Sequence, residues 1–85
     1  MKFGQAIESL KQGKKVAREG WNGKGMYLIY FNPEAHNPET LLVYASELGI
    51  EKALLPCILL KTPGYMYVPW LASHTDILAE DWQEV

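Results

Sequence analysis

The sequence contains a single cysteine, Cys57, so it has no internal disulfide. Cys57 lies within Ala53–Leu60, an uncharged apolar run that is far too short to cross a bilayer. Residues 1–10 include the charged side chains of Lys2 and Glu8 and no apolar stretch, so we expect no secretory signal. These absences predict a cytoplasmic protein without a membrane span, in which the cysteine is a buried, inert thiol.

The sequence also has little net charge. The formal charge is −2, which argues against binding to long nucleic acid, because such binding needs many phosphate contacts. Basic residues gather before position 25, whereas four acidic residues crowd the last ten positions: Asp76, Glu80, Asp81 and Glu84. Solvated surfaces explain most of this asymmetry, and a small anionic ligand held by a few basic groups is also compatible with it.

Residue sets that could perform catalysis are scarce. Ser73, His74 and Asp76 are the residue types of a hydrolytic triad, but side chains crowded into one turn rarely converge in the required line. Asp76 and Glu80, at i and i+4, could sit on one helical face and share a metal, but with only His74 as a further nearby ligand the metal signal is weak. The glycines at 20, 23 and 25 lack the following helix that a phosphate-binding loop needs. We therefore predict no enzyme activity, catalytic residue, metal site or cofactor.

Apolar residues, in contrast, are abundant for so short a chain. They make up 48% of the 85 residues, and the chain includes three tryptophans and five tyrosines. A chain of this size buries only roughly 60–65% of the surface that its unfolded form exposes. We therefore expect one domain over residues 1–85 that buries further apolar surface between subunits.

Local patterns predict an α+β fold: a small, mostly antiparallel sheet with an N-terminal helix and one or two short helices. Apolar spacing predicts the first helix over Phe3–Gln12, and Gly13 is a natural C-terminal stop. Ser73 and Asp76 have the spacing of a capping box. Strands are predicted over residues 14–19, 26–31, 55–61, 65–68 and 82–85, and the last of them is expected at a sheet edge. A helical turn is predicted over 77–80. Residues 40–48 could form a helix, a strand or an irregular segment.

The connection between the first two predicted strands has the strongest functional signal. Asn22-Gly23 is typical of a hairpin turn, because both residues tolerate a positive φ. Trp21 stands beside this turn and either folds back onto the core or offers a stacking surface to a base. Arg18 and Lys24, close by, could hold phosphate.

Two other tryptophans differ in their expected roles. Trp70 follows Pro69, which cannot donate a hydrogen bond to a neighbouring strand and fixes the chain direction. We therefore expect Trp70 to leave the sheet at this point, where it could contact a ligand. Trp82 lies in an alternating tail and is expected in the core or at a subunit contact.

Several segments together resemble the Thoeris anti-defence two family of small phage and prophage proteins. The resemblance rests on Phe3-Gly4-Gln5-Ala6-Ile7, Gly13-Lys14-Lys15-Val16-Ala17-Arg18, Gly20-Trp21-Asn22-Gly23-Lys24, Val68-Pro69-Trp70 and Thr75-Asp76-Ile77-Leu78-Ala79-Glu80-Asp81-Trp82. Residues 32–54 match poorly, and Ala72 and His74 depart from the usual Pro and Gln.

The resemblance implies a non-enzymatic sponge that acts in the host cytoplasm. Family members sequester cyclic ADP-ribose-type signals made by bacterial TIR-domain proteins, or cyclic oligonucleotides, in pockets between the protomers of a homotetramer. The matching positions that would line such a pocket are Trp21, Asn22, Gly23, Lys24, Thr75 and Asp76, with Gln5 as a weaker candidate.

Two other classes of function stay open from the residues alone. One is a structural or protein-binding oligomer in which Trp21 and Trp70 are buried at subunit contacts. The other is a small hydrolase of nucleotide signals that uses Asp76, Glu80 or His74.

Overall fold

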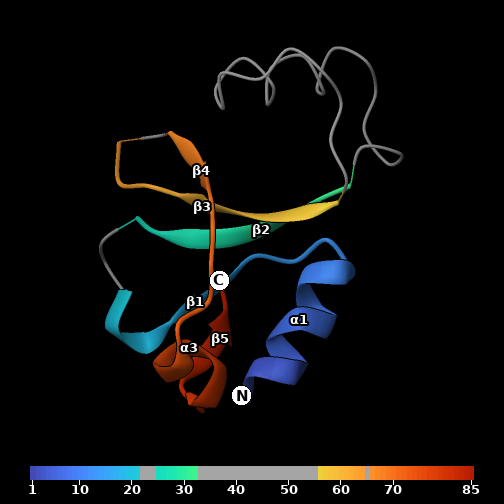
Figure 1. Cartoon of the computed structure of the whole chain (residues 1–85), viewed down its shortest axis with the longest axis vertical. Coiled ribbons are helices and arrows are strands. Elements are labelled where there is room, and N and C mark those ends of the chain that lie inside the picture. The colour runs from blue at the N-terminus through green and yellow to red at the C-terminus, as the bar shows by residue number, and fades with distance from the viewer. Residues whose placement is uncertain (22–24, 33–55, 65) are drawn as a thin grey trace.

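The computed structural model describes residues 1–21, 25–32, 56–64 and 66–85 (Figure 1). Within these ranges the chain forms a sheet of five strands with two α-helices. In chain order the elements are α1 (Phe3–Lys11), β1 (Val16–Arg18), the 3-10 turn η1 (Glu19–Trp21), β2 (Tyr27–Phe31), β3 (Cys57–Lys61), β4 (Tyr67–Pro69), α3 (His74–Leu78) and β5 (Trp82–Glu84). The predicted α+β class is confirmed. The predictions for Asn22-Gly23 and for residues 40–48 lie outside the described residues.

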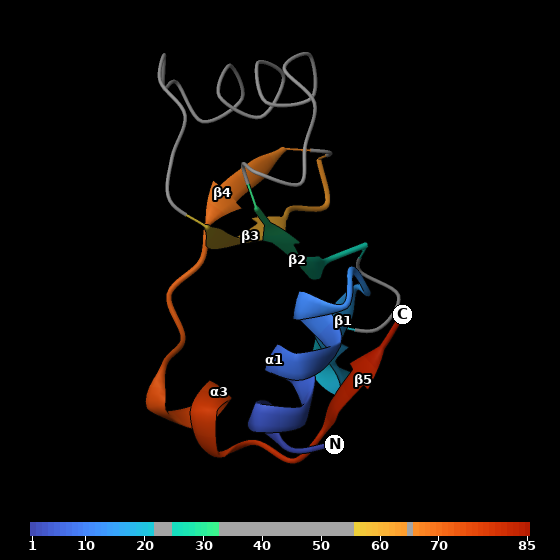
Figure 2. The ribbon, with the colours of Figure 1, turned by 90° about the vertical axis from the view of Figure 1, so that its right-hand side faces the viewer.

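The sheet has the order β4-β3-β2-β1-β5, and all neighbouring strands are antiparallel. The strand β5 lies at an edge, as predicted, and its register places Trp82 opposite Arg18. The helix α1 contacts β1, β2 and β5, and its beginning lies beside α3 (Figure 2). The sheet therefore brings the end of β1, the start of β5 and the short helix α3 to one end of the molecule.

A compact apolar cluster joins α1 to the sheet. It consists of Ala6, Leu10, Val16, Leu28 and Trp82, each no more than 1% exposed. Val16 and Leu28 are opposite each other in the β1–β2 register, and cross-strand partners point to the same face of a sheet. The predicted apolar side of the first helix is therefore the side that packs on the sheet.

The first helix ends as the sequence predicts, within one residue. Gly13 has a φ of +88°, its N–H bonds the carbonyl of Leu10, and the N–H of Lys14 bonds the carbonyl of Ser9. These two bonds define a Schellman motif, in which glycine takes the left-handed position at low steric cost.

The second described helix differs from the prediction. It covers His74–Leu78, not 77–80, because its N-cap is Ser73 and the first helical residue directly follows an N-cap. Ala79 is extended, with a ψ of 148°. Glu80 therefore lies outside the helix, and the proposed sharing of one helical face by Asp76 and Glu80 is wrong.

The last hairpin also differs in detail. The strand β4 ends at Pro69, but the N–H of Trp70 still donates to the carbonyl of Ile58 at 3.0 Å. Trp70 thus leaves the sheet one ladder bond later than predicted.

None of the helices in the described ranges has the length and apolar character that crossing a membrane requires.

Candidate functional site

An arginine held between two aspartates joins three elements at the α3 end of the molecule. Arg18 donates from Nε to Oδ1 of Asp81 at 3.0 Å and from Nη1 to Oδ1 of Asp76 at 3.1 Å. The side chains of Arg18, Asp76 and Asp81 are 26%, 15% and 32% exposed, respectively. The hydrogen bond with Asp81 is the main reason that the pKa of Arg18 is raised. The arginine therefore ties β1 both to α3 and to the residue that precedes β5.

Asp76 also completes the capping box predicted from the sequence. Its Oδ2 accepts from the N–H of Ser73 at 2.9 Å and from the Ser73 hydroxyl at 2.8 Å, and its own N–H donates to Oγ of Ser73 at 3.2 Å. Partial burial raises the pKa of Asp76, but the hydrogen bonds from Ser73 and Arg18 outweigh burial and lower the pKa below its ordinary value. Asp76 is therefore ionised at neutral pH. Within the described ranges these contacts use three of its four lone pairs, and one on Oδ1 is left for a further donor.

Trp82 contacts both the group formed by Arg18, Asp76 and Asp81 and the neighbouring aromatic residues. Its side chain is buried, which confirms the predicted core position, and its Nε1 donates to the carbonyl of Asp76 at 2.9 Å. Trp21 and Trp70 both meet it edge-on, with ring centroids at 5.6 Å and 5.9 Å, and Phe3 is at 5.7 Å. One indole therefore fixes α3 through its N–H and two further tryptophans through its ring.

Trp21 packs on the core and keeps part of its surface accessible. The ring packs on Trp82, so the side chain does fold back onto the core, yet it stays partly exposed. Its backbone belongs to η1, which continues directly from β1. The remaining accessible surface of Trp21 is held in a fixed orientation, as a stacking surface requires.

The structure brings together four of the residues that the sequence selected: Arg18, Trp21, Trp70 and Asp76 surround Trp82. Thr75 is exposed on the same helix as Asp76, and its hydroxyl lies 2.8 Å from that of Ser73. The predicted site residues Asn22, Gly23 and Lys24 lie outside the described residues.

Gln5 lies apart from this group, on α1. Its Oε1 accepts from the backbone N–H of Lys2 at 2.8 Å, and this contact belongs to the start of the helix. The side chain is exposed, but its oxygen already serves the helix N-terminus.

Asp81 is the member that the sequence did not select. It appeared there among several acidic residues near the C-terminal end of the chain and within a family motif, but not as a site residue, and 63 positions separate it from Arg18. The pairing of Asp81 with Arg18 can be recognised only once the strand register is known. In that register Arg18 lies opposite Trp82, and Asp81 directly precedes Trp82.

The charge of this cluster constrains the ligand chemistry. One guanidinium and two carboxylates give a net charge of −1. Such a surface favours hydroxyl and amino donors over a phosphate at Arg18, because a phosphate would lie close to two carboxylates. The chemistry suits the recognition of a sugar hydroxyl or a base amino group.

The crowded Ser–His–Asp group does not have the geometry of a nucleophile and its base. The Ser73 hydroxyl donates to Asp76, and the side chain of His74 is exposed. In the described part of the chain no group of three or more His, Cys, Asp or Glu side chains could hold a metal ion.

Two comparisons with known proteins bear on the identity of this chain. The family model of the Thoeris anti-defense 2-like domain matches residues 1–85, which includes the centre where the motif resemblance is poor. The protein named Thoeris anti-defense 2 of Bacillus phage SP01 is 39% identical over 85 residues, a match that covers 100% of this chain and 94% of the relative. The chain therefore belongs to the Thoeris anti-defense 2-like family, and this membership supports a role in phage anti-defence.

Proposed function

We propose that this protein is a sponge for an immune signal: it binds a cyclic ADP-ribose-type or cyclic oligonucleotide messenger in the host cytoplasm and holds it without cleavage. Family membership supports the anti-defence role. The family resemblance further suggests a homotetramer with pockets between protomers, and TIR-domain proteins as the source of the signal.

The observation that carries the proposal is the double contact of Trp82. Its ring supports Trp21 and its Nε1 supports the backbone of Asp76, so a stacking surface and a hydrogen-bond acceptor are held at fixed positions. A nucleotide offers groups for both, because its base can stack on Trp21 and a ribose hydroxyl can donate to the remaining lone pair on Oδ1 of Asp76.

Arg18 acts in this proposal mainly as a positioning residue. Its guanidinium orients Asp76 and Asp81, and its charge is offset by theirs. The phosphates of the ligand would then be bound by other cations, and Lys24 is the candidate that the family motif supplies.

Binding without turnover agrees with the way Ser73 is bonded. Its hydroxyl donates directly to the Asp76 carboxylate, and among the described residues no hydrogen bond joins it to an imidazole that could take its proton. We expect cyclic ADP-ribose isomers incubated with the protein to be recovered intact after heat denaturation and chromatography. Steady loss of the ligand with time would show that the protein is a hydrolase.

Calorimetric titration of single variants tests the assigned roles. Trp21→Ala should weaken binding by roughly 1–3 kcal/mol, the range for a base–aromatic contact. Asp76→Ala should weaken it by about 1.5–3 kcal/mol, as for a hydrogen bond to a charged group. Trp21→Phe keeps a stacking ring and is the matched control.

The rival function, a structural oligomer without ligand, predicts a different pattern. The partial packing of Trp21 and Trp70 on Trp82 favours it as the second candidate. In that case Trp21→Ala would lower the oligomer mass in light scattering, and the wild-type protein would bind none of the nucleotides tested.

A further inference from the structure

The candidate site takes its residues from two parts of the sheet. Arg18 and Trp21 belong to β1 and to the turn that follows it, whereas Trp70 directly follows β4. The strand β1 pairs with β5 over three register positions, and β3 pairs with β2 over five and with β4 over three. Within the described residues β1 and β2 share one register position, Val16 opposite Leu28. The placement of Trp21 relative to Trp70 therefore depends on how this β1–β2 junction is held.

The apolar cluster under α1 holds the junction on one face of the sheet, and a second group of side chains holds it on the other. Leu28 belongs to the apolar cluster, so Tyr27 points to the opposite face, because side chains alternate along a strand. Lys61 is opposite Tyr27 in the β2–β3 register and shares that face. The Nζ atoms of Lys15 and Lys61 lie 4.8 Å and 5.4 Å from the centre of the Tyr27 ring. Cation–π contacts thus join β3, β2 and the residue that precedes β1.

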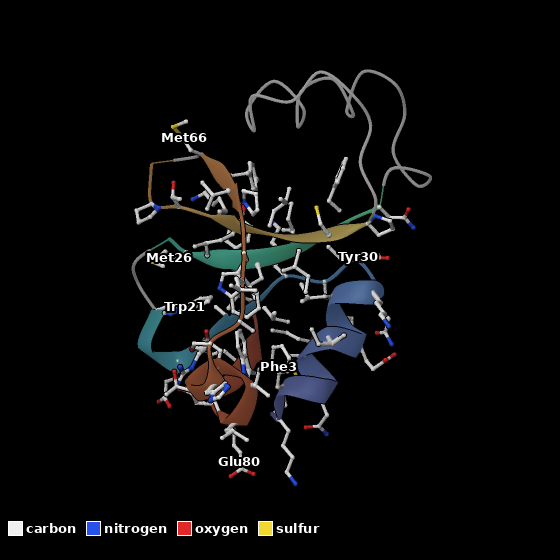
Figure 3. All side chains as sticks on the ribbon, viewed as in Figure 1. Phe3, Trp21, Met26, Tyr30, Met66 and Glu80 are labelled. Atoms are coloured by element: carbon white, nitrogen blue, oxygen red, sulfur yellow. The ribbon has the colours of Figure 1, made fainter. Side chains whose placement is uncertain are left out.

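Lys61 also fixes the chain where it returns from Trp21 to β2. The residue is 9% exposed, which is unusual for lysine, and its Nζ donates to the carbonyl of Gly25 at 2.9 Å. Gly25 has a φ of +69° and directly precedes Met26. Figure 3 shows Trp21 and Met26 at the same side of the molecule, with Tyr30 at the opposite side. One buried ammonium therefore bonds the end of this connection and contacts the ring that bridges the junction.

We propose that Lys61 is a positioning residue for the candidate site: through the Gly25 carbonyl and the Tyr27 ring, it sets the placement of Trp21 relative to Trp70. The inference rests on the proposed function, because it gives Lys61 a part in nucleotide binding without contact to the nucleotide. Hydrogen bonds from an ionised donor are roughly twice as strong as neutral ones. Loss of this ammonium should therefore loosen the junction, while the apolar cluster keeps the chain folded.

The first test needs no ligand. Each of the three tryptophans has one indole N–H, so a nitrogen-15 NMR spectrum reports them separately once single Trp→Phe variants have assigned the signals. Lys61→Met keeps an unbranched side chain but removes the charge, and it should shift or broaden the signals of Trp21 and Trp70. The control is Lys11→Met, the same change at an exposed lysine of α1, which should leave all three signals in place. Unchanged signals of Trp21 and Trp70 in Lys61→Met would overturn the proposal.

A binding cycle distinguishes positioning from a general loss of stability. With cyclic ADP-ribose as the probe, Lys61→Met should raise the Kd measured by calorimetry about tenfold, an effect within the range for residues of one network. In the Trp21→Ala background the same change should raise the Kd about threefold or less, because Lys61 acts through the placement of Trp21. A merely structural role would give equal factors in the two backgrounds, and that result would overturn the proposal.

Tyr27→Leu provides a second variant if Lys61→Met does not fold, which circular dichroism shows. It removes the ring that both lysines contact and leaves the Lys61 ammonium in place, so it should shift the same two indole signals. Unchanged signals in a folded Tyr27→Leu protein would overturn the role of the ring. A wild-type protein that binds neither cyclic ADP-ribose nor a cyclic dinucleotide would overturn the sponge function, whereas the indole signals decide the role of Lys61 without any ligand.

Discussion

The two α-helices of the described chain are held in place by different forces. The nine-residue α1 buries Ala6, Ser9 and Leu10 against the sheet. The five-residue α3 buries none of its residues and is held by hydrogen bonds with Ser73, Arg18 and Trp82. Burial of an apolar face is spread over many contacts, whereas α3 relies on a few named polar atoms. The helix that carries the candidate site is therefore the one whose position single substitutions can change.

The largest expected effect is on the apolar side of this comparison. Leu10→Ala should lower the free energy of unfolding by roughly 2–5 kcal/mol, because a fully buried leucine loses its contacts and leaves a cavity. Leu78→Ala, at an exposed leucine on α3, should change it by about 0.5 kcal/mol or less. Urea unfolding followed by circular dichroism measures both. Equal losses in the two variants would show that α3 packs as α1 does.

Trp82→Phe affects both helices, and it distinguishes the contribution of apolar packing from that of the indole hydrogen bond. The phenyl ring keeps much of the packing near Phe3, but the carbonyl of Asp76 loses its indole donor. The cost should be about 1–3 kcal/mol for an unsatisfied, partly buried acceptor. Amide hydrogen exchange should accelerate more in α3 than in α1. Uniform acceleration along the chain would mean that lost volume, not the lost hydrogen bond, dominates.

A smaller effect is expected from the helix cap. Ser73→Ala removes the acceptor for the N–H of Asp76 and should cost about 1 kcal/mol, the usual value of an N-cap. The loss should be confined to α3 in hydrogen-exchange measurements. Ser73→Asp keeps a capping oxygen, but it places a second carboxylate beside Asp76, so it should recover only part of the protection. Full loss of protection in α1 as well would contradict the separation of the two helices.

The smallest effect is a dependence of stability on pH. Asp76 has a lowered pKa in the folded state, so it binds protons less readily there than in the unfolded chain. Its contribution to stability is complete above the unfolded pKa of about 3.9 and is lost as the pH falls through the lower folded pKa. Asp76→Asn should therefore flatten the acid limb of the stability curve below about pH 4. An acid limb of unchanged slope in this variant would assign the effect to other carboxylates.

Sequence patterns predicted the local parts of the fold well and the candidate site only in part. The spacing of apolar residues and Gly13 located the first helix, and the capping box predicted for Ser73 and Asp76 is present. The boundaries were less accurate, because the prediction began the last helix at Ile77, three residues beyond its true start at His74. Trp21, Trp70 and Asp76 were selected and do lie together, whereas Asp81 was missed.

What the sequence determines by itself is set by interactions that close within a few residues. The bonds around Gly13 span three and five positions, and Ser73 and Asp76 are three apart, so neither depends on the rest of the chain. Motifs at both ends of the chain were likewise sufficient to indicate the family.

Only the tertiary structure decided how Arg18 and Trp82 are used. The contacts of Arg18 with Asp76 and Asp81 span 58 and 63 positions, and they exist because the β1–β5 register sets Arg18 opposite Trp82. Strand order and register depend on the packing of the whole sheet, which no local pattern specifies. That packing left Arg18 between two carboxylates and made one buried indole the support of both Trp21 and α3.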